Sequence, residues 1–341
     1  MKEKHITTDS LEDKFNIIFT SPDPDLLLRL NEQIATVAQQ LGTEPHLPTL
    51  PDRGFLESPL DPVNEGGLLK HLSETYAQNA VALQDKLTSV VLDESGEKML
   101  NLPALFQSHG IDISLSSLPF HSACGDWSGQ QRVFWVRESV GERILKAGES
   151  LKSIGVVLHL EDGFRPVGVQ EGLFSRRVGM ILNEHPEWID EWEKVWKEAR
   201  SKTAISPWMA GHKSGAAIDI TLYSSDGKPL PLGNKYPDGG PKVAIDYPYV
   251  TQEEWATRQL FTATMEMSGL RLYPYENWHV SFGDLSAGIQ AYSMTEITPN
   301  YHGIYGPIKG FDPTTGDVEP YPIEEYFEPF FTKEELLAQF Q

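Results

Sequence analysis

The sequence predicts an α+β fold in which a small antiparallel sheet is flanked by helices and preceded by a mostly helical N-terminal extension. Two observations support this prediction. Apolar residues recur at helical spacing in several stretches of the N-terminal half, and strand-like segments at 216–223 and 278–282 lie on either side of another helical stretch at 252–267. Helices before and after a group of strands favour a sheet with helices packed on it.

The N-terminal extension contains two predicted helices. In the first, Leu26–Leu41, the apolar residues share one helical face. The second covers about Leu68–Leu87, and the Pro- and Gly-rich segment 43–67 connects the two. Residues 90–127 show no regular pattern. We interpret residues 1–125 as a helical and irregular accessory region.

The main domain is expected over residues 126–305. Its first part contains five predicted elements in chain order: a helix over 134–151, a strand over 155–160, a turn over 161–166, and helices over 169–182 and 186–199.

A predicted strand over 216–223 begins the second part of this domain. Ile218 lies on its apolar face and Asp219 on the opposite face, because successive strand residues point to opposite sides. The turn Asp226-Gly227 predicts a hairpin with a return strand over 229–232.

A Gly- and Pro-rich segment over 234–248 follows and is a candidate lid. Thr251 and Glu254 form a capping box for the helix over 252–267, after which strands are expected over 270–273 and 278–282. The remaining aromatic tail, 306–341, is expected to pack on the core of the same chain rather than on another subunit.

The composition of the 341-residue chain limits the classes of function. A formal net charge of −21 argues against a general nucleic-acid binder or a protein of anionic membranes. Cys124 is the one cysteine, which excludes an intramolecular disulfide and a Cys-based zinc finger. The polar N-terminus lacks the apolar region of a signal peptide, and no apolar run approaches the ~20 residues of a membrane span. We therefore expect a cytoplasmic protein.

Four side chains are candidates for the chemistry: His212, Asp219, Glu276 and His279. Two imidazoles and one carboxylate could bind a zinc ion, which leaves the other carboxylate free to act on zinc-bound water. Glu276 and His279 are three apart, so a bend near Asn277 is required for both to reach one metal. From the residues alone, packed hydrogen-bonded histidines and a solvated aspartate stay open as alternatives.

Three segments strengthen the metal interpretation. In chain order they are Glu-Asp-Gly-Phe-Arg-Pro (161–166), Gly-His-Lys-Ser-Gly-Ala-Ala-Ile-Asp (211–219) and Tyr-Glu-Asn-Trp-His (275–279). Together they resemble the signatures of the VanX-type D-alanyl-D-alanine dipeptidases, which are zinc D-Ala-D-Ala metallopeptidases. The resemblance spans about residues 134–282.

The resemblance implies one Zn²⁺ per chain, with His212, Asp219 and His279 as its ligands. It implies that Glu276 is the catalytic base. Arg165 matches the arginine that polarises the scissile carbonyl or holds the substrate. Independently of the family, a guanidinium suits a carboxylate or an oxyanion.

The sequence also departs from the family pattern. Ala210 stands where the family has a serine that holds the C-terminal carboxylate of the substrate. The family's Phe-Asp pair, whose aspartate binds the substrate amino end, reads Tyr236-Pro237-Asp238 here, and Asp238 could serve although it is displaced by one position. We expect Tyr236 and Asp238 to contact substrate. Residues 1–125 have no counterpart in the short dipeptidases.

These observations predict a zinc dipeptidase that hydrolyses D-Ala-D-Ala or a related small dipeptide containing D-residues. One alternative is a D,D-carboxypeptidase or endopeptidase of the same fold that acts on peptidoglycan stems. Two others are a non-haem iron oxygenase, which also uses two histidines and a carboxylate, and a non-catalytic binding module on the zinc fold.

Overall fold

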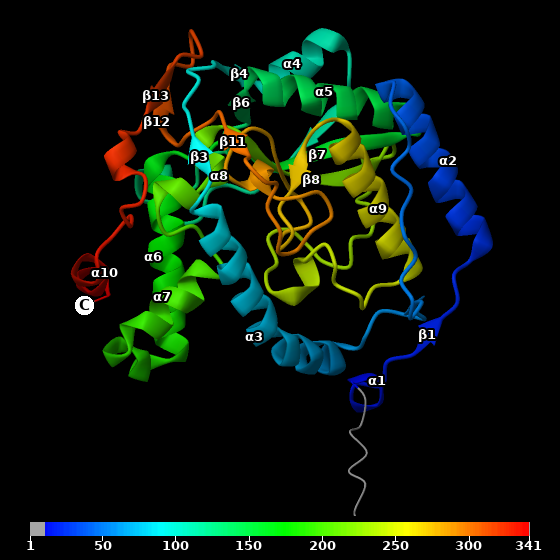
Figure 1. Cartoon of the computed structure of the whole chain (residues 1–341), viewed down its shortest axis with the longest axis horizontal. Coiled ribbons are helices and arrows are strands. Elements are labelled where there is room, and N and C mark those ends of the chain that lie inside the picture. Colours follow the sequence, from blue (N-terminus) through cyan, green and yellow to red (C-terminus); the bar gives the residue numbers. More distant parts are fainter. Residues whose placement is uncertain (1–10, 341) are drawn as a thin grey trace, which may run out of the picture.

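The computed structural model describes residues 11–340 and has a mixed α/β architecture with several small sheets (Figure 1). The start of the predicted accessory region, residues 1–10, lies outside the described residues. The α-helices are α1 (Leu11–Lys14), α2 (Pro24–Leu41), α3 (Pro62–Leu87), α4 (Leu102–His109), α5 (Glu138–Lys152), α6 (Val167–Glu184), α7 (Trp192–Arg200), α8 (Gly211–Ser214), α9 (Gln252–Met267) and α10 (Lys333–Gln339).

The strands are short apart from β7 and β8. They are β1 (Phe19–Thr20), β2 (Phe55–Leu56), β3 (Val91–Leu92), β4 (Met99–Asn101), β5 (Ile113–Leu115), β6 (Trp135–Arg137), β7 (Val156–Asp162), β8 (Ala217–Ser224), β9 (Arg271–Leu272), β10 (His279–Ser281), β11 (His302–Gly303), β12 (Ile308–Phe311) and β13 (Val318–Pro320).

A five-stranded sheet in the order β5-β7-β8-β10-β9 forms the centre of the described fold. β8 pairs antiparallel with both β7 and β10, and β10 pairs antiparallel with β9. The prediction of a small antiparallel sheet is wrong at one edge, because β5 pairs with β7 in parallel. β5 comes from the stretch that showed no pattern in the sequence, which is why this pairing was not foreseen.

Helices α2, α5 and α9 cover one face of this sheet. Ile218, Ile220 and Leu222 of β8 point into the core that these helices share. α9 begins at the predicted capping box, in which Thr251 and Glu254 bond each other's backbone. The apolar face of β8 therefore packs against these helices, and the polar side chains of β8 lie on its opposite face.

The N-terminal helix α2 is packed directly on the centre of the molecule. Asp23 caps its first turn and Gly42 ends it in the left-handed conformation, with φ of 68°. Ile34 and Val37 are fully buried in the same core as β8, and α2 lies beside α9 (Figure 1). Full burial of each such aliphatic side chain contributes about 1.5–3 kcal/mol. The division into regions 1–125, 126–305 and 306–341 stays a prediction.

Several predicted elements differ from the structure at their ends. Residues 135–137, expected in a helix, form β6 and pair with β4. The helix expected over 186–199 is divided into a 3₁₀ helix, Pro186–Asp190, and α7. The return strand expected over 229–232 is reduced to an isolated bridge between Tyr223 and Pro229. Farther along this edge of β8, the backbone N–H of Ile220 donates to the carbonyl of Trp278, next to β10, so β10 and not the return segment pairs there.

Within residues 11–340, no helix is both long and apolar enough to cross a membrane. The expected cytoplasmic location stays a prediction.

Candidate active site

The central sheet places three polar side chains in one row. β8 pairs with β10 in the register that sets Asp219 opposite His279. On its other side, a β-bulge between Leu160 and Asp162 shifts the register so that Asp162 pairs with Asp219. Because paired residues on neighbouring strands project from the same face, Asp162, Asp219 and His279 are brought together.

His212 reaches this row from α8, the short helix that precedes β8. Gly215 ends α8 with φ of 71°, a conformation that favours glycine and turns the chain into the strand. Nδ1 of His212 lies 2.8 Å from the carbonyl oxygen of Gly163. A carbonyl can only accept, so Nδ1 carries the proton and Nε2 presents a lone pair.

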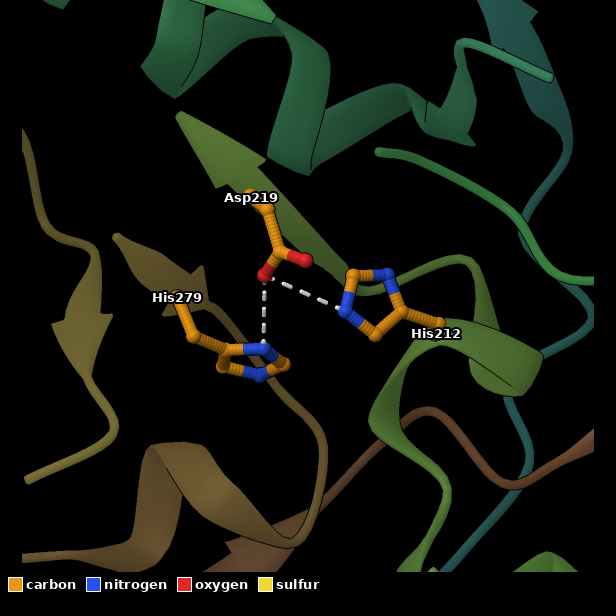
Figure 2. Close-up of side chains that lie close together, drawn as sticks. All are labelled: His212, Asp219 and His279. Atoms are coloured by element: carbon orange, nitrogen blue, oxygen red, sulfur yellow. Dashed lines mark hydrogen bonds and ion pairs between the residues drawn. The ribbon is translucent and has the colours of Figure 1, made fainter. Parts of the chain in front are cut away.

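His212, Asp219 and His279 form a buried group that could hold a metal ion (Figure 2). Oδ1 of Asp219 lies 3.2 Å from Nε2 of His212 and 3.1 Å from Nδ1 of His279. One candidate ligand atom from each residue lies within 4.8 Å of the others.

The buried Nε2 of His212 makes no hydrogen bond to any residue that the structure describes. The lone pair of this nitrogen faces Oδ1 of Asp219 at 3.2 Å. Both atoms are acceptors, so a cation bound between them would stabilise the arrangement. Two imidazoles and a carboxylate are a donor set that suits zinc. The residues present therefore fit the metal that the sequence predicted.

Electrostatics favour the metal-binding forms of His212 and Asp219. Burial, assisted by the charge of Arg165, lowers the pKa of His212 and favours its neutral form. Burial acts to raise the pKa of Asp219, but the imidazoles of His212 and His279 outweigh it and hold that pKa well below its usual range. Burial acts to lower the pKa of His279, but the hydrogen bond and charge of Asp219 raise it, so a proton competes with a cation there.

Glu276 lies beside the imidazole of His279. Its Oε2 is 3.8 Å from Nδ1 of His279. The bend that the sequence required near Asn277 is present as a turn, in which the backbone N–H of His279 donates to the carbonyl of Glu276. Burial raises the pKa of Glu276, although its side chain is 40% exposed and remains open to solvent.

Arg165 lies on the other side of the Asp219 carboxylate. Its Nη2 is 3.4 Å from Oδ2 of Asp219, and its Nε donates to Oδ2 of Asp162 at 2.9 Å. Asp162 is almost fully buried and also forms an ion pair with Arg132. Asp162 therefore holds the guanidinium of Arg165 beside the candidate metal-binding group.

Sequence reasoning missed Asp162 and Arg132. Asp162 could have been found, because it belongs to the Glu-Asp-Gly-Phe-Arg-Pro segment. Arg132 lies in no recognised motif, so only the structure shows that it belongs to the site. Its Nε donates to the carbonyl of Leu118, and its Nη1 donates to the hydroxyl of Tyr236 at 3.2 Å.

The two expected substrate-binding residues lie in different surroundings. The hydroxyl of Tyr236 contacts Asp219, in the candidate metal-binding group. The carboxylate of Asp238 instead contacts the backbone N–H of Lys235 and, at 3.1 Å, the ammonium of Lys242. Ala210 is buried just before α8 and supplies no hydroxyl. The structure therefore places Tyr236 beside Asp219, whereas Asp238 contacts two lysines of its own loop, Lys235 and Lys242.

The fold and this group of side chains define a candidate hydrolytic site, and comparison with known proteins identifies its family. A family model described as D-Ala-D-Ala dipeptidase matches residues 124–296, about half of the chain, and this range contains all three motifs. The chain belongs to this family and is a peptidase, and therefore a hydrolase.

Two D-alanyl-D-alanine dipeptidases are similar to the chain. The protein from Synechocystis sp. (strain ATCC 27184 / PCC 6803 / Kazusa) is 27% identical over 197 residues, which cover 50% of this chain and 78% of the relative. The protein from Enterococcus faecium is 28% identical over 156 residues, which cover 42% of this chain and 71% of the relative. The similarity covers most of each relative, and about half of this chain lies outside it.

We predict that Asp162→Asn lowers the free energy of unfolding by about 3–5 kcal/mol, because Arg132 and Arg165 both lose a buried carboxylate partner. Asp226→Asn is the matched control: Asp226 pairs with Lys228 on the surface, and its loss should cost under about 1 kcal/mol. Urea unfolding of both variants measures the difference. Equal losses would show that Asp162 is not a buried anchor.

Proposed function

We propose that this protein is a zinc-dependent dipeptidase that hydrolyses D-Ala-D-Ala or a related small dipeptide containing D-residues. The observation that carries the proposal is the buried group of His212, Asp219 and His279, with Glu276 on one side and Arg165 on the other. The family membership and the two similar dipeptidases support the reaction class.

The proposed zinc ligands are Nε2 of His212, a carboxylate oxygen of Asp219 and Nδ1 of His279, one ion per chain. When bound, zinc would supply a Lewis acid and would lower the pKa of a coordinated water to near neutrality. The hydrogen bond from Nδ1 of His212 to Gly163 fixes the tautomer and the orientation of that imidazole.

Glu276 is the proposed general base. Its carboxylate takes the proton from the attacking water and later delivers it to the leaving amine. Burial raises the pKa of Glu276, and a higher pKa makes its carboxylate a stronger base. Its partial exposure keeps the carboxylate accessible to water and to a peptide.

Arg165 is the proposed stabiliser of the oxyanion that develops on the scissile carbonyl. Its guanidinium is held by Asp162 before substrate arrives, so little reorganisation is needed when negative charge forms. Burial acts to lower the pKa of Arg165, but the charge of Asp162 outweighs it and raises that pKa, so the group stays charged.

The proposed substrate is a small dipeptide with a free amino end. Ala210 cannot donate the hydroxyl hydrogen bond that the family's serine gives to the C-terminal carboxylate. The roles of Tyr236 and Asp238 in holding the substrate stay predictions. These departures favour a preference among dipeptides that differs from strict D-Ala-D-Ala specificity.

Glu276→Gln should lower kcat for D-Ala-D-Ala by about 10²–10⁴-fold, because the amide cannot accept the proton of water, while zinc content stays unchanged. Glu253→Gln, an exposed acid at the start of α9, is the control and should leave kcat within about twofold. Steady-state kinetics with metal analysis of each variant checks both. Retained activity in Glu276→Gln would exclude Glu276 as the base.

The purified protein should contain about one zinc per chain, and chelation should remove both the metal and the hydrolytic activity. His212→Ala should lose zinc and activity together, because one of three protein ligands is missing. Elemental analysis measures the metal. Stoichiometric iron with oxygen-dependent turnover would favour an oxygenase instead, and bound zinc without hydrolysis of any dipeptide would favour a binding module.

Hydrolysis should be faster for D-Ala-D-Ala and related D-dipeptides than for a muropeptide that ends in the same residues. A free substrate amino end is the feature that separates the two, so an N-acetylated dipeptide should be a poor substrate. Comparing kcat/KM for the three compounds measures this preference. Faster cleavage of the muropeptide would favour the D,D-carboxypeptidase or endopeptidase alternative.

A further inference from the structure

The hydroxyl of Tyr236 lies against the Asp219 carboxylate of the proposed zinc site, and the proposed mechanism gives it no role in proton transfer or in oxyanion stabilisation. Its Oη is 3.1 Å from Oδ2 of Asp219. This oxygen is the one turned away from the imidazoles, since Oδ1 faces both His212 and His279.

The neighbours of the hydroxyl decide where its one proton points. Nη1 of Arg132 donates to Tyr236 Oη at 3.2 Å, which uses the oxygen as an acceptor. The proton can then go to Oδ2 of Asp219 at 3.1 Å or to Oδ2 of Asp162 at 3.5 Å. The Asp162 oxygen already accepts from Arg132 and from Arg165, so the shorter contact to Asp219 is favoured.

Packing fixes the ring that carries this hydroxyl. The ring of Tyr236 meets the indole of Trp278 edge to face, with centroids 5.3 Å apart. The guanidinium of Arg132 lies over the ring, 5.5 Å from its centroid, and is held in turn by Leu118 and Asp162. These contacts therefore fix the orientation of the Tyr236 hydroxyl relative to the Asp219 carboxylate.

We propose that Tyr236, held by Arg132, is a positioning residue for the metal site of this chain. It donates to Oδ2 of Asp219 and so keeps Oδ1 turned toward the two imidazoles. Groups that orient a ligand in this way change metal affinity, because a carboxylate free to rotate must be ordered when the ion binds. The inference rests on the proposed zinc site, and it assigns Tyr236 to the metal rather than to the substrate.

The test is the zinc affinity of Tyr236→Phe, measured on the full chain by competition with a chromophoric chelator. Phenylalanine keeps the ring packing and removes only the hydroxyl. The apparent Kd for zinc should rise about 10-fold or more. Tyr223→Phe on β8 is the matched control, since the Tyr223 ring stacks on His159 and its hydroxyl bonds no described residue; its Kd should stay within about twofold.

Arg132→Lys provides a second variant if Tyr236→Phe does not fold. Lysine keeps the positive charge beside Asp162 but lacks the planar fork that reaches Leu118 and Tyr236 together. The apparent zinc Kd of Arg132→Lys should therefore also be higher than that of the wild-type chain.

The outcomes separate this inference from the proposed function. A wild-type chain that binds zinc, with Tyr236→Phe within twofold of it, overturns the inference alone. A raised KM for D-Ala-D-Ala at unchanged zinc Kd likewise overturns it and assigns the hydroxyl to substrate. A wild-type chain without zinc affinity overturns both.

Discussion

The carboxylate of Asp219 is the constraint on which the rest of the site depends. It is buried inside the protein, where an unpaired charge is strongly destabilising. One oxygen faces two imidazoles and the other faces Tyr236 and Arg165, so each side of the charge has a partner. The segments that supply these partners must all meet at β8, which explains why the site lies at the centre of the sheet.

Two arginines lie in the site although the chain as a whole is acidic. The chain carries a formal net charge of −21, yet Arg132 and Arg165 lie beside the metal-binding group. Asp162 pairs with both, so the two guanidinium groups are held in fixed positions next to Asp219. The charges next to Asp219 are therefore set by the local placement of these arginines and not by the net charge of the chain.

The N-terminal region is part of the same packed structure, although the three motifs begin only at residue 161. α2 shares a core with α5, α9 and β8, and β5 adds an edge strand beside β7. The helices were predictable because one continuous segment carries their apolar periodicity. β5 was not, since a three-residue strand is stabilised by its neighbour and leaves no pattern of its own.

The sequence by itself determined the mixture of helices and strands and the main helices. It also singled out His212, Asp219, Glu276, His279 and Arg165 as candidates, since each lies in a motif of a few adjacent residues. Only the tertiary structure decided how the group is held. The bulge before Asp162 sets the register of β7 against β8, and Arg132 meets Tyr236 across 104 residues of chain. Such contacts depend on strand register and on loop paths in space, and no periodicity or local spacing in the sequence encodes them.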